Sequence, residues 1–333
     1  MSKGVGRVVS ERMRSRALVG NALEDPHVRD VPVYLPPGYD DSTRRYPVIF
    51  VLVGFGSSGQ ALLNFNGFGE PLDRRLDRLI SRGAMKPCVV VMPDAFTALG
   101  GSQYIDSPGT GRYGRYLTKE LVRFVDARFR TLPVARHRAV VGKSSGGYGA
   151  LVHGMTHPDV FGALASHSGD VAFEHCYMHD FPIALGELER AGGVEPWLRK
   201  FRAAKKKSHA QIATLNIVAM TACYSPKRGL PLLCDFPFDL RTAAVREPVW
   251  RRWLAHDPLR MLPAHARALR SLRLVYLDAG RKDEWNLHLG ARAFVDKARA
   301  LGVKVVHEEF DDGHMDISYR YDVSLPLVSK AIS

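Results

Sequence analysis

The chain has 333 residues, of which 46% are hydrophobic, and a formal net charge of +13 from 47 Lys and Arg against 34 Asp and Glu. Such a chain buries a sizeable core in one large domain or two smaller ones, as a soluble globular protein does. Charges are scattered through the first 21 residues, and no apolar run approaches a membrane span, so we expect a cytoplasmic protein without a signal peptide.

The positive charge is spread along the chain, which does not favour nucleic-acid binding. The basic run Lys205–Lys207 is explained by a solvated helix face. The four cysteines are irregularly spaced and form no C-x-x-C pair, which argues against a structural zinc site and against a disulfide framework.

Short β-branched or aromatic runs predict strands, in chain order, at 33–35, 48–53, 89–92, 139–141, 163–167, 272–277 and 303–310. Helical stretches lie between most of them, and 115–130 illustrates the helical period, with one apolar face formed by Leu117, Leu121, Phe124, Val125 and Phe129. Buried strands that alternate with helices indicate an α/β fold with a mainly parallel central sheet and helices on both faces.

Between residues 171 and 255 this alternation stops. We interpret the segment as a cap-like insertion within a single domain that spans residues 1–333. Its aromatic side chains either line a pocket at the carboxyl ends of the strands or form the cap's own core, and both interpretations stay open for Trp197, Phe236, Phe238, Trp250 and Trp253.

A possible metal site lies in the same insertion, where His175, Cys176, His179 and Asp180 are closely spaced. The segment FEHCYMHDFP ends in proline, which favours loop residues over metal ligands. We therefore expect no metal.

Ser144 is the predicted nucleophile, at the centre of Gly142-Lys143-Ser144-Ser145-Gly146. A G-x-S-x-G turn between a strand and a helix holds its serine in a strained backbone and lifts the hydroxyl clear of the sheet. Gly142-Lys143-Ser144 could also end a phosphate-binding P-loop, but that motif needs glycine where the chain has His137, so a P-loop is excluded. Ser145 is a poorer candidate, because a G-x-S-x-G motif centred on Ser145 would need glycine at position 143, where the chain has Lys143.

A serine nucleophile needs a general base and a carboxylate that orients the base. In this fold class the acid follows a late strand and the histidine follows the last one. The strand 272–277 leads to Asp283, our predicted acid, with Glu284 as the alternative and Asp278 holding the turn. The strand 303–310 leads to His314, the predicted base.

The loop Gly54-Phe55-Gly56-Ser57-Ser58-Gly59 follows the strand 48–53 and predicts half of an oxyanion hole. We expect the donors to be the N–H groups of Ser145 and Phe55, with Gly56 second. The loop also matches G-x-G-x-x-G, but no acidic residue ends a second strand about 20 residues later, so we expect neither a nucleotide nor another cofactor. Residues expected to contact substrate are Gly54, Gly56, Tyr104, Phe236, Trp250 and Trp285.

With these residues in place, the chain resembles the α/β-hydrolase "putative esterase" family, which includes esterase D, enterochelin esterases, feruloyl esterases and the antigen 85 mycolyltransferases. The resemblance is carried by Val33 to Tyr39, Tyr46-Pro47, Gly54-Phe55, Val91 to Asp94, Gly142 to Ala150, His157-Pro158, Phe161 and Gly313-His314. It implies an α/β-hydrolase fold without a cofactor, and it assigns nucleophile, acid and base to Ser144, Asp283 and His314.

Departures from the family pattern limit the substrate prediction. Many members have His and Met where this chain has Val53 and Ser145, and the insertion is longer than in compact members. The segment Ser15 to Asn21 looks most like the enterochelin-esterase-like branch.

These features predict a serine carboxylic-ester hydrolase that acts through an acyl-enzyme on a small to medium ester. Alternatives are an acyltransferase with the same triad, a siderophore-lactone esterase of the enterochelin type, and a catalytically silent binding protein on the same scaffold. The basic charge suggests an acidic or phenolic substrate as a hypothesis. Whether the protein forms a homo-oligomer stays open.

Overall fold

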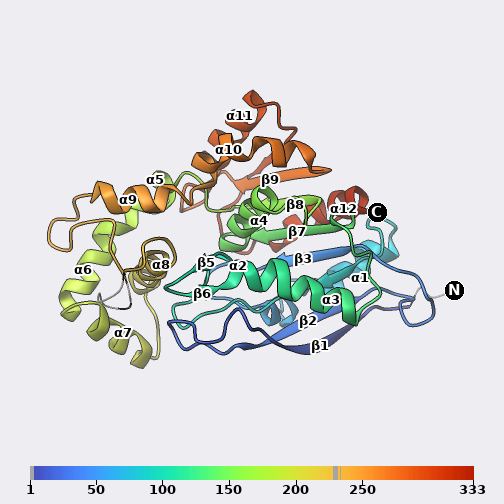
Figure 1. Cartoon of the computed structure of the whole chain (residues 1–333), viewed down its shortest axis with the longest axis horizontal. Coiled ribbons are helices and arrows are strands. Elements are labelled where there is room, and N and C mark those ends of the chain that lie inside the picture. The colour runs from blue at the N-terminus through green and yellow to red at the C-terminus, as the bar shows by residue number, and fades with distance from the viewer. Residues whose placement is uncertain (1–3, 228–231, 233) are drawn as a thin grey trace.

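The computed structural model describes residues 4–227, 232 and 234–333. Its centre is an eight-stranded sheet with the order β1-β2-β4-β3-β7-β8-β9-β10, in which β1, β2 and β4 pair antiparallel and the other neighbours pair parallel (Figure 1). The strands are β1 Arg7–Arg14, β2 Val28–Leu35, β3 Val48–Leu52, β4 Val89–Val91, β7 Arg138–Lys143, β8 Ala163–His167, β9 Leu274–Gly280 and β10 Val306–Phe310. A short hairpin, β5 Asp106–Ser107 and β6 Gly111–Arg112, lies outside the sheet.

Helices cover both faces of the sheet, because its central strands are apolar on both sides. In β3, Val48, Phe50 and Leu52 pack into one core, and Ile49 and Val51 pack into another. The first core includes side chains from α3 Val122–Arg128, α4 Ser145–Thr156, α10 Pro258–Ser271 and α11 Leu287–Ala300; the second includes α1 Leu72–Ser81 and α12 Tyr321–Ile332. The predicted fold class is confirmed.

Near the sheet, an edge strand and one helix differ from the sequence prediction. The edge strand β1 was not predicted, because only Met13 of its sequence RVVSERMR is buried and its charges hide the alternation. The helix expected over 115–130 is broken into α2 Tyr113–Arg115, a π-helical segment Tyr116–Leu121 and α3. Its apolar face is still buried, because Leu117, Leu121 and Val125 belong to the core between helices and sheet.

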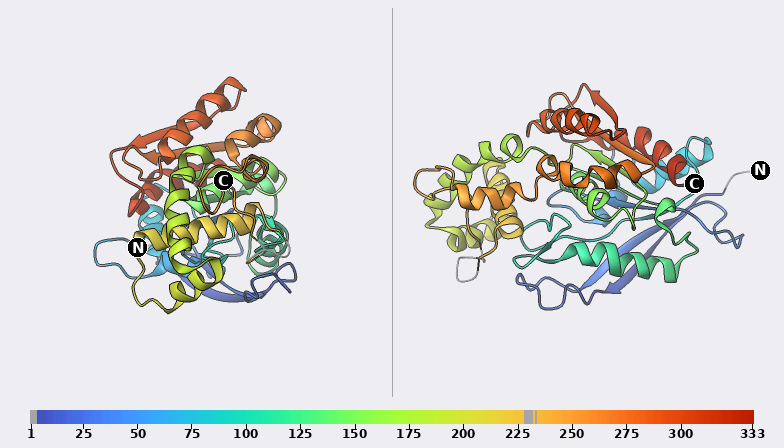
Figure 2. Two further views of the ribbon diagram at one scale, coloured as in Figure 1. Left: turned by 90° about the vertical axis from the view of Figure 1, so that its left-hand side faces the viewer. Right: turned by 45° about the horizontal axis from the view of Figure 1, so that its top comes forward.

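The insertion after β8 is helical. It contains α5 Phe173–Cys176, a 3₁₀ turn Met178–Asp180, α6 Phe181–Ala191, α7 Val194–Ala203, α8 His209–Tyr224 and α9 Glu247–Leu254. These helices gather at the end of the molecule opposite the C-terminus, as Figure 1 and the right-hand view of Figure 2 show. We call them the cap. The prediction that FEHCYMHDFP forms a loop was wrong. Pro182 lies in the first turn of α6, where proline is tolerated, so it does not prevent helix formation.

The aromatic side chains of the cap belong to one buried apolar cluster, which also includes side chains of the scaffold, and this decides between the two interpretations. Phe236 and Trp250 are 5% and 4% exposed, and Phe181 packs against Phe238, Trp250 and Trp253. This corrects the expectation that Phe236 and Trp250 contact substrate, since both rings are used in packing. Among the described residues, no helix is both long and apolar enough to cross a membrane.

Candidate active site

Ser144 lies in a sharp turn between β7 and α4, with φ 58° and ψ −126°. Its N–H donates to the carbonyl of His167 at 2.9 Å, and its carbonyl accepts from Tyr148 N–H at 2.9 Å. Glycine is required beside it, because a Cβ on Gly146 would lie 2.2 Å from the carbonyl oxygen of Leu52. The turn is therefore a strained elbow that β3 and β8 hold in place.

Asp283 and His314 form a hydrogen-bonded pair beyond the ends of β9 and β10. His314 Nδ1 lies 2.8 Å from Asp283 Oδ2, and the two residues are 5% and 3% exposed. The other carboxylate oxygen, Oδ1, accepts the N–H of Trp285 at 3.0 Å. Because a carboxylate only accepts, the imidazole proton sits on Nδ1, and Nε2 is left as the basic nitrogen.

The environment of Asp283 keeps it ionised. Burial alone would raise the pKa of its carboxyl, but the hydrogen bond and charge of His314, together with the Trp285 N–H, bring the pKa below its ordinary value. Glu284 has a different contact, since its Oε2 accepts the backbone N–H of His314 at 2.8 Å. Of the two acids considered, Asp283 contacts the imidazole and Glu284 contacts the backbone of the same histidine.

A cavity of about 450 Å³ brings these groups together at the carboxyl ends of the strands. The scaffold contributes to its wall Gly54, Phe55, Lys143, Ser144, Ser145, Asp170, Trp285, Leu287, His314 and Met315; the cap and the segments that join it contribute Cys176, Tyr177, Lys207, Ser208, His209, Ile212, Ala213 and Asn216. The ring of Trp285 meets that of His314 edge-on, with 4.8 Å between centroids. Ser144 and His314 share this cavity without a hydrogen bond between their side chains, and such contacts commonly tighten only with substrate bound.

Four of the expected contact residues have other roles. Within the described part of the chain, the cavity wall does not include Gly56, Tyr104, Phe236 or Trp250. The N–H of Gly56 donates to Gly100 at 2.7 Å, and the hydroxyl of Tyr104 both donates to and accepts from the backbone of Val53 at 2.9 Å. Gly56 and Tyr104 therefore hold the loop after β3 in shape.

This arrangement favours Phe55 over Gly56 as an oxyanion donor. The Gly56 N–H is already used by Gly100, whereas the N–H groups of Phe55 and Ser145 have no hydrogen-bond acceptor among the described residues. Both residues line the cavity beside Ser144. A substrate oxygen held there would receive two backbone donors.

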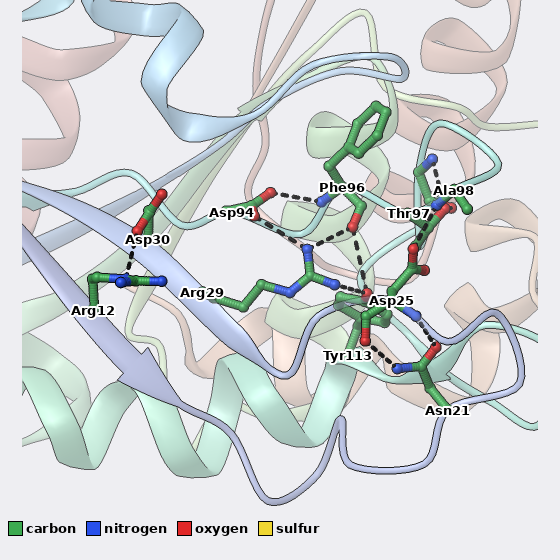
Figure 3. A network of polar contacts seen from close by, with 11 residues as sticks. Arg12, Asn21, Asp25, Arg29, Asp30, Asp94, Phe96, Thr97, Ala98 and Tyr113 are labelled. Carbon is green, nitrogen blue, oxygen red and sulfur yellow. Dashed lines mark hydrogen bonds and ion pairs between the residues drawn. The ribbon is translucent and has the colours of Figure 1, made fainter. Parts of the chain in front are cut away.

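A polar network anchors the segment that supports this loop (Figure 3). Arg29 is 3% exposed and donates to Asp94 at 3.1 Å, to the carbonyl of Phe96 at 2.8 Å and to the hydroxyl of Tyr113 at 2.5 Å. The anchored segment continues to Gly100, whose carbonyl accepts from Gly56. Sequence reasoning missed this network, although Asp94 stood in a segment that carried the family resemblance.

A second buried Asp–His pair lies directly behind the elbow. Asp278 Oδ1 is 2.7 Å from His167 Nδ1, and His167 Nε2 is 2.8 Å from Ser324 Oγ. All three residues are at most 1% exposed, and Arg320 also donates to Asp278. Enclosure separates this trio from substrate, so it braces the ends of β8 and β9. Asp278, expected to hold the turn, instead lies within β9 and joins three elements.

Comparisons with known proteins identify the family of the chain. The family described as "Putative esterase" matches residues 24–316. Esterase Rv1288 of Mycobacterium tuberculosis (strain ATCC 25618 / H37Rv) is 30% identical over 168 residues, which cover 49% of this chain and 35% of that protein. The chain thus matches about a third of the length of this curated relative.

Solved structures show the same fold over nearly the whole chain. A ferulic acid esterase superposes with a TM-score of 0.62 at 19% identity, covering 99% of both chains. An S-formylglutathione hydrolase from Agrobacterium tumefaciens gives 0.57 at 16% identity, covering 98% of this chain and 96% of that one. FphF, a fluorophosphonate-binding serine hydrolase of Staphylococcus aureus, gives 0.61 at 15% identity, covering 99% and 100%. By its sequence match and its α/β-hydrolase fold, the chain belongs to the Putative esterase family.

Proposed function

We propose that this protein is a serine carboxylic-ester hydrolase, with Ser144 as nucleophile, His314 as general base and Asp283 as the orienting acid. The observation that carries the proposal is the hydrogen bond between Asp283 and His314 at a cavity that also holds Ser144 in a strained elbow. The catalytic unit is a single domain, and residues 171–255 are its cap.

In the first half of the reaction, Ser144 Oγ attacks the ester carbonyl carbon as its proton passes to Nε2 of His314. The carbonyl oxygen becomes negative and is held by the N–H groups of Phe55 and Ser145. Each such donor contributes about 10²- to 10³-fold in rate. Asp283 stabilises the imidazolium that forms.

Collapse of the tetrahedral intermediate breaks the bond to the alcohol, which leaves with the proton returned by His314. The acyl group then remains on Ser144. Water enters, gives a proton to His314 and attacks the acyl carbonyl, and a second collapse releases the acid and restores the serine. All these steps use groups of this chain and water.

The test is hydrolysis of 4-nitrophenyl esters from acetate to decanoate by the wild type, Ser144→Ala and Ser145→Ala. We expect Ser144→Ala to lower kcat by roughly 10⁴-fold or more. Ser145→Ala keeps the backbone donor and serves as the matched control, with at least about a tenth of wild-type activity. A Ser144→Ala variant that keeps more than a tenth of the activity would contradict the assignment.

A further inference from the structure

The cavity beside Ser144 contains more positive charge than ester hydrolysis requires. We propose that the ester it accepts carries an anionic group, such as a carboxylate, that binds Lys143 and Lys207. The inference rests on the proposed function, because it concerns the substrate of the same site. Both lysines line the cavity, one on the scaffold side and one on the cap side.

Lys143 precedes the nucleophile directly and is the last residue of β7. Its side chain is half-buried, and its ammonium group forms no hydrogen bond or ion pair among the described residues. Because no described group of the cavity wall pairs with it, this ammonium can donate charge-assisted hydrogen bonds to an anion that arrives with the substrate.

The acidic groups near Lys143 do not already serve as its partners. Asp283 is occupied by His314 and Trp285, and Glu284 is occupied by the His314 backbone. Asp316 is exposed to solvent. Burial lowers the pKa of Lys143, and the charges of these three carboxylates act against that shift.

Lys207 is held in place on the cap side of the cavity. Its ammonium donates to the carbonyls of Phe201 and Ala204 and lies 4.7 Å from the centre of the Phe201 ring. An ammonium group has three N–H donors, so these two carbonyls leave one for a ligand. The first turn of α8 follows immediately, and Ser208 and His209 also line the cavity there. The positive end of that helix adds to the field of Lys207.

The carboxyl group in the cavity wall is already hydrogen-bonded to neutral partners and pairs with neither lysine. Asp170 accepts hydrogen bonds from Gln103 at 2.9 Å and from Tyr177 at 2.8 Å, and burial raises its pKa. The remaining wall is largely apolar, with Phe55, Ile212, Ala213, Trp285, Leu287 and Met315. The cavity therefore suits an ester with a hydrocarbon body and one anionic group.

Two matched substrate pairs test the proposal and locate the anion. In the first pair, 4-nitrophenyl hydrogen glutarate is compared with 4-nitrophenyl pentanoate, which has an acyl chain of equal length without the carboxylate. In the second pair, 5-acetoxy-2-nitrobenzoate, which has the carboxylate on the alcohol side, is compared with 4-nitrophenyl acetate. The quantity measured is the ratio of kcat/KM for the anionic and the neutral member, corrected for spontaneous hydrolysis.

We expect the wild type to favour the anionic member of at least one pair by about tenfold, as charge-assisted hydrogen bonds commonly give. Lys143→Met and Lys207→Met should each reduce that ratio severalfold, and Lys143→Arg should restore much of it. Lys330→Met removes the same charge from an exposed position on α12 and should leave the ratio unchanged.

Wild-type ratios near one in both pairs, with the neutral esters hydrolysed, would overturn the anionic substrate and leave the esterase intact. A preference that survives in both Lys143→Met and Lys207→Met would overturn the assignment to these lysines. Failure to hydrolyse any of the four esters, together with no phosphonate adduct on Ser144, would refute the esterase and this inference with it.

Discussion

The choice between Asp283 and Glu284 as the catalytic acid leads to the sharpest prediction, made on two neighbouring residues. Asp283→Asn keeps the shape of the side chain. Its amide oxygen should keep the hydrogen bond from Trp285 N–H that Oδ1 now accepts at 3.0 Å, which turns the amide nitrogen toward His314. An amide nitrogen donates, so Nδ1 of His314 would have to accept and the imidazole proton would move to Nε2. The histidine could then no longer take a proton from Ser144.

The magnitude follows from that loss. The same substitution in a serine protease triad, a known precedent, lowers kcat by about 10⁴, which corresponds to about 5.5 kcal/mol at 1.36 kcal/mol per factor of ten. Glu284→Gln should cost at most about tenfold, because the amide oxygen can still accept the His314 N–H that Oε2 accepts at 2.8 Å.

The assay is kcat for a 4-nitrophenyl ester at pH 8, with thermal unfolding of both variants as a check on folding. We expect a loss of about four orders of magnitude in Asp283→Asn and at most one in Glu284→Gln. A thousandfold loss in Glu284→Gln alongside near wild-type kcat in Asp283→Asn would refute the assignment and make Glu284 the acid.

Three further predictions concern the surroundings of the site. Gly146→Ala places a Cβ 2.2 Å from the Leu52 carbonyl, so urea unfolding should show a loss of about 3 kcal/mol or more, whereas Gly67→Ala, in open space, should cost under about 1 kcal/mol. His153 is fully buried, and burial lowers its pKa to about 4. As the pH falls, the unfolded chain therefore takes up a proton at this histidine before the folded protein does, which favours unfolding. Between pH 7 and 5 the free energy of unfolding of the wild type should fall by about 2 kcal/mol more than that of His153→Gln, and equal losses would contradict this. Arg29→Met removes three hydrogen bonds that anchor the segment supporting the loop after β3, and it should lower kcat by about tenfold to a hundredfold. Arg12→Met removes an exposed ion pair and should leave kcat within about twofold.

The sequence predicted the parts of the molecule whose residues act locally. The apolar strands and the G-x-S-x-G elbow depend on short runs of neighbouring residues, and the parallel sheet then brings Asp283 and His314 together because their strands β9 and β10 are paired. For that reason, short sequence patterns were enough to assign both residues to one site. Their catalytic roles stay predictions.

The parts that sequence reasoning missed depend on contacts between distant residues. From the sequence, Phe236 and Trp250 could face either a pocket or a cap core. In the structure Phe236 packs edge-to-face on Phe238 and Trp250 on Phe181, so both belong to the core. The loop after β3 is supported by Gly100, and the segment of Gly100 is anchored by Arg29, so these contacts join residues far apart in the chain. No local pattern encodes such contacts. The buried trio of Asp278, His167 and Ser324 was missed for the same reason.

The central claim is that Ser144 is an activated nucleophile in this cavity. Its most direct test is labelling of the wild type, Ser144→Ala and Ser145→Ala with a fluorophosphonate, followed by peptide mass mapping. We predict a single adduct on the peptide that contains Ser144 in the wild type and in Ser145→Ala, and none in Ser144→Ala. An adduct that persists in Ser144→Ala, or a folded wild type that stays unlabelled, would contradict the account.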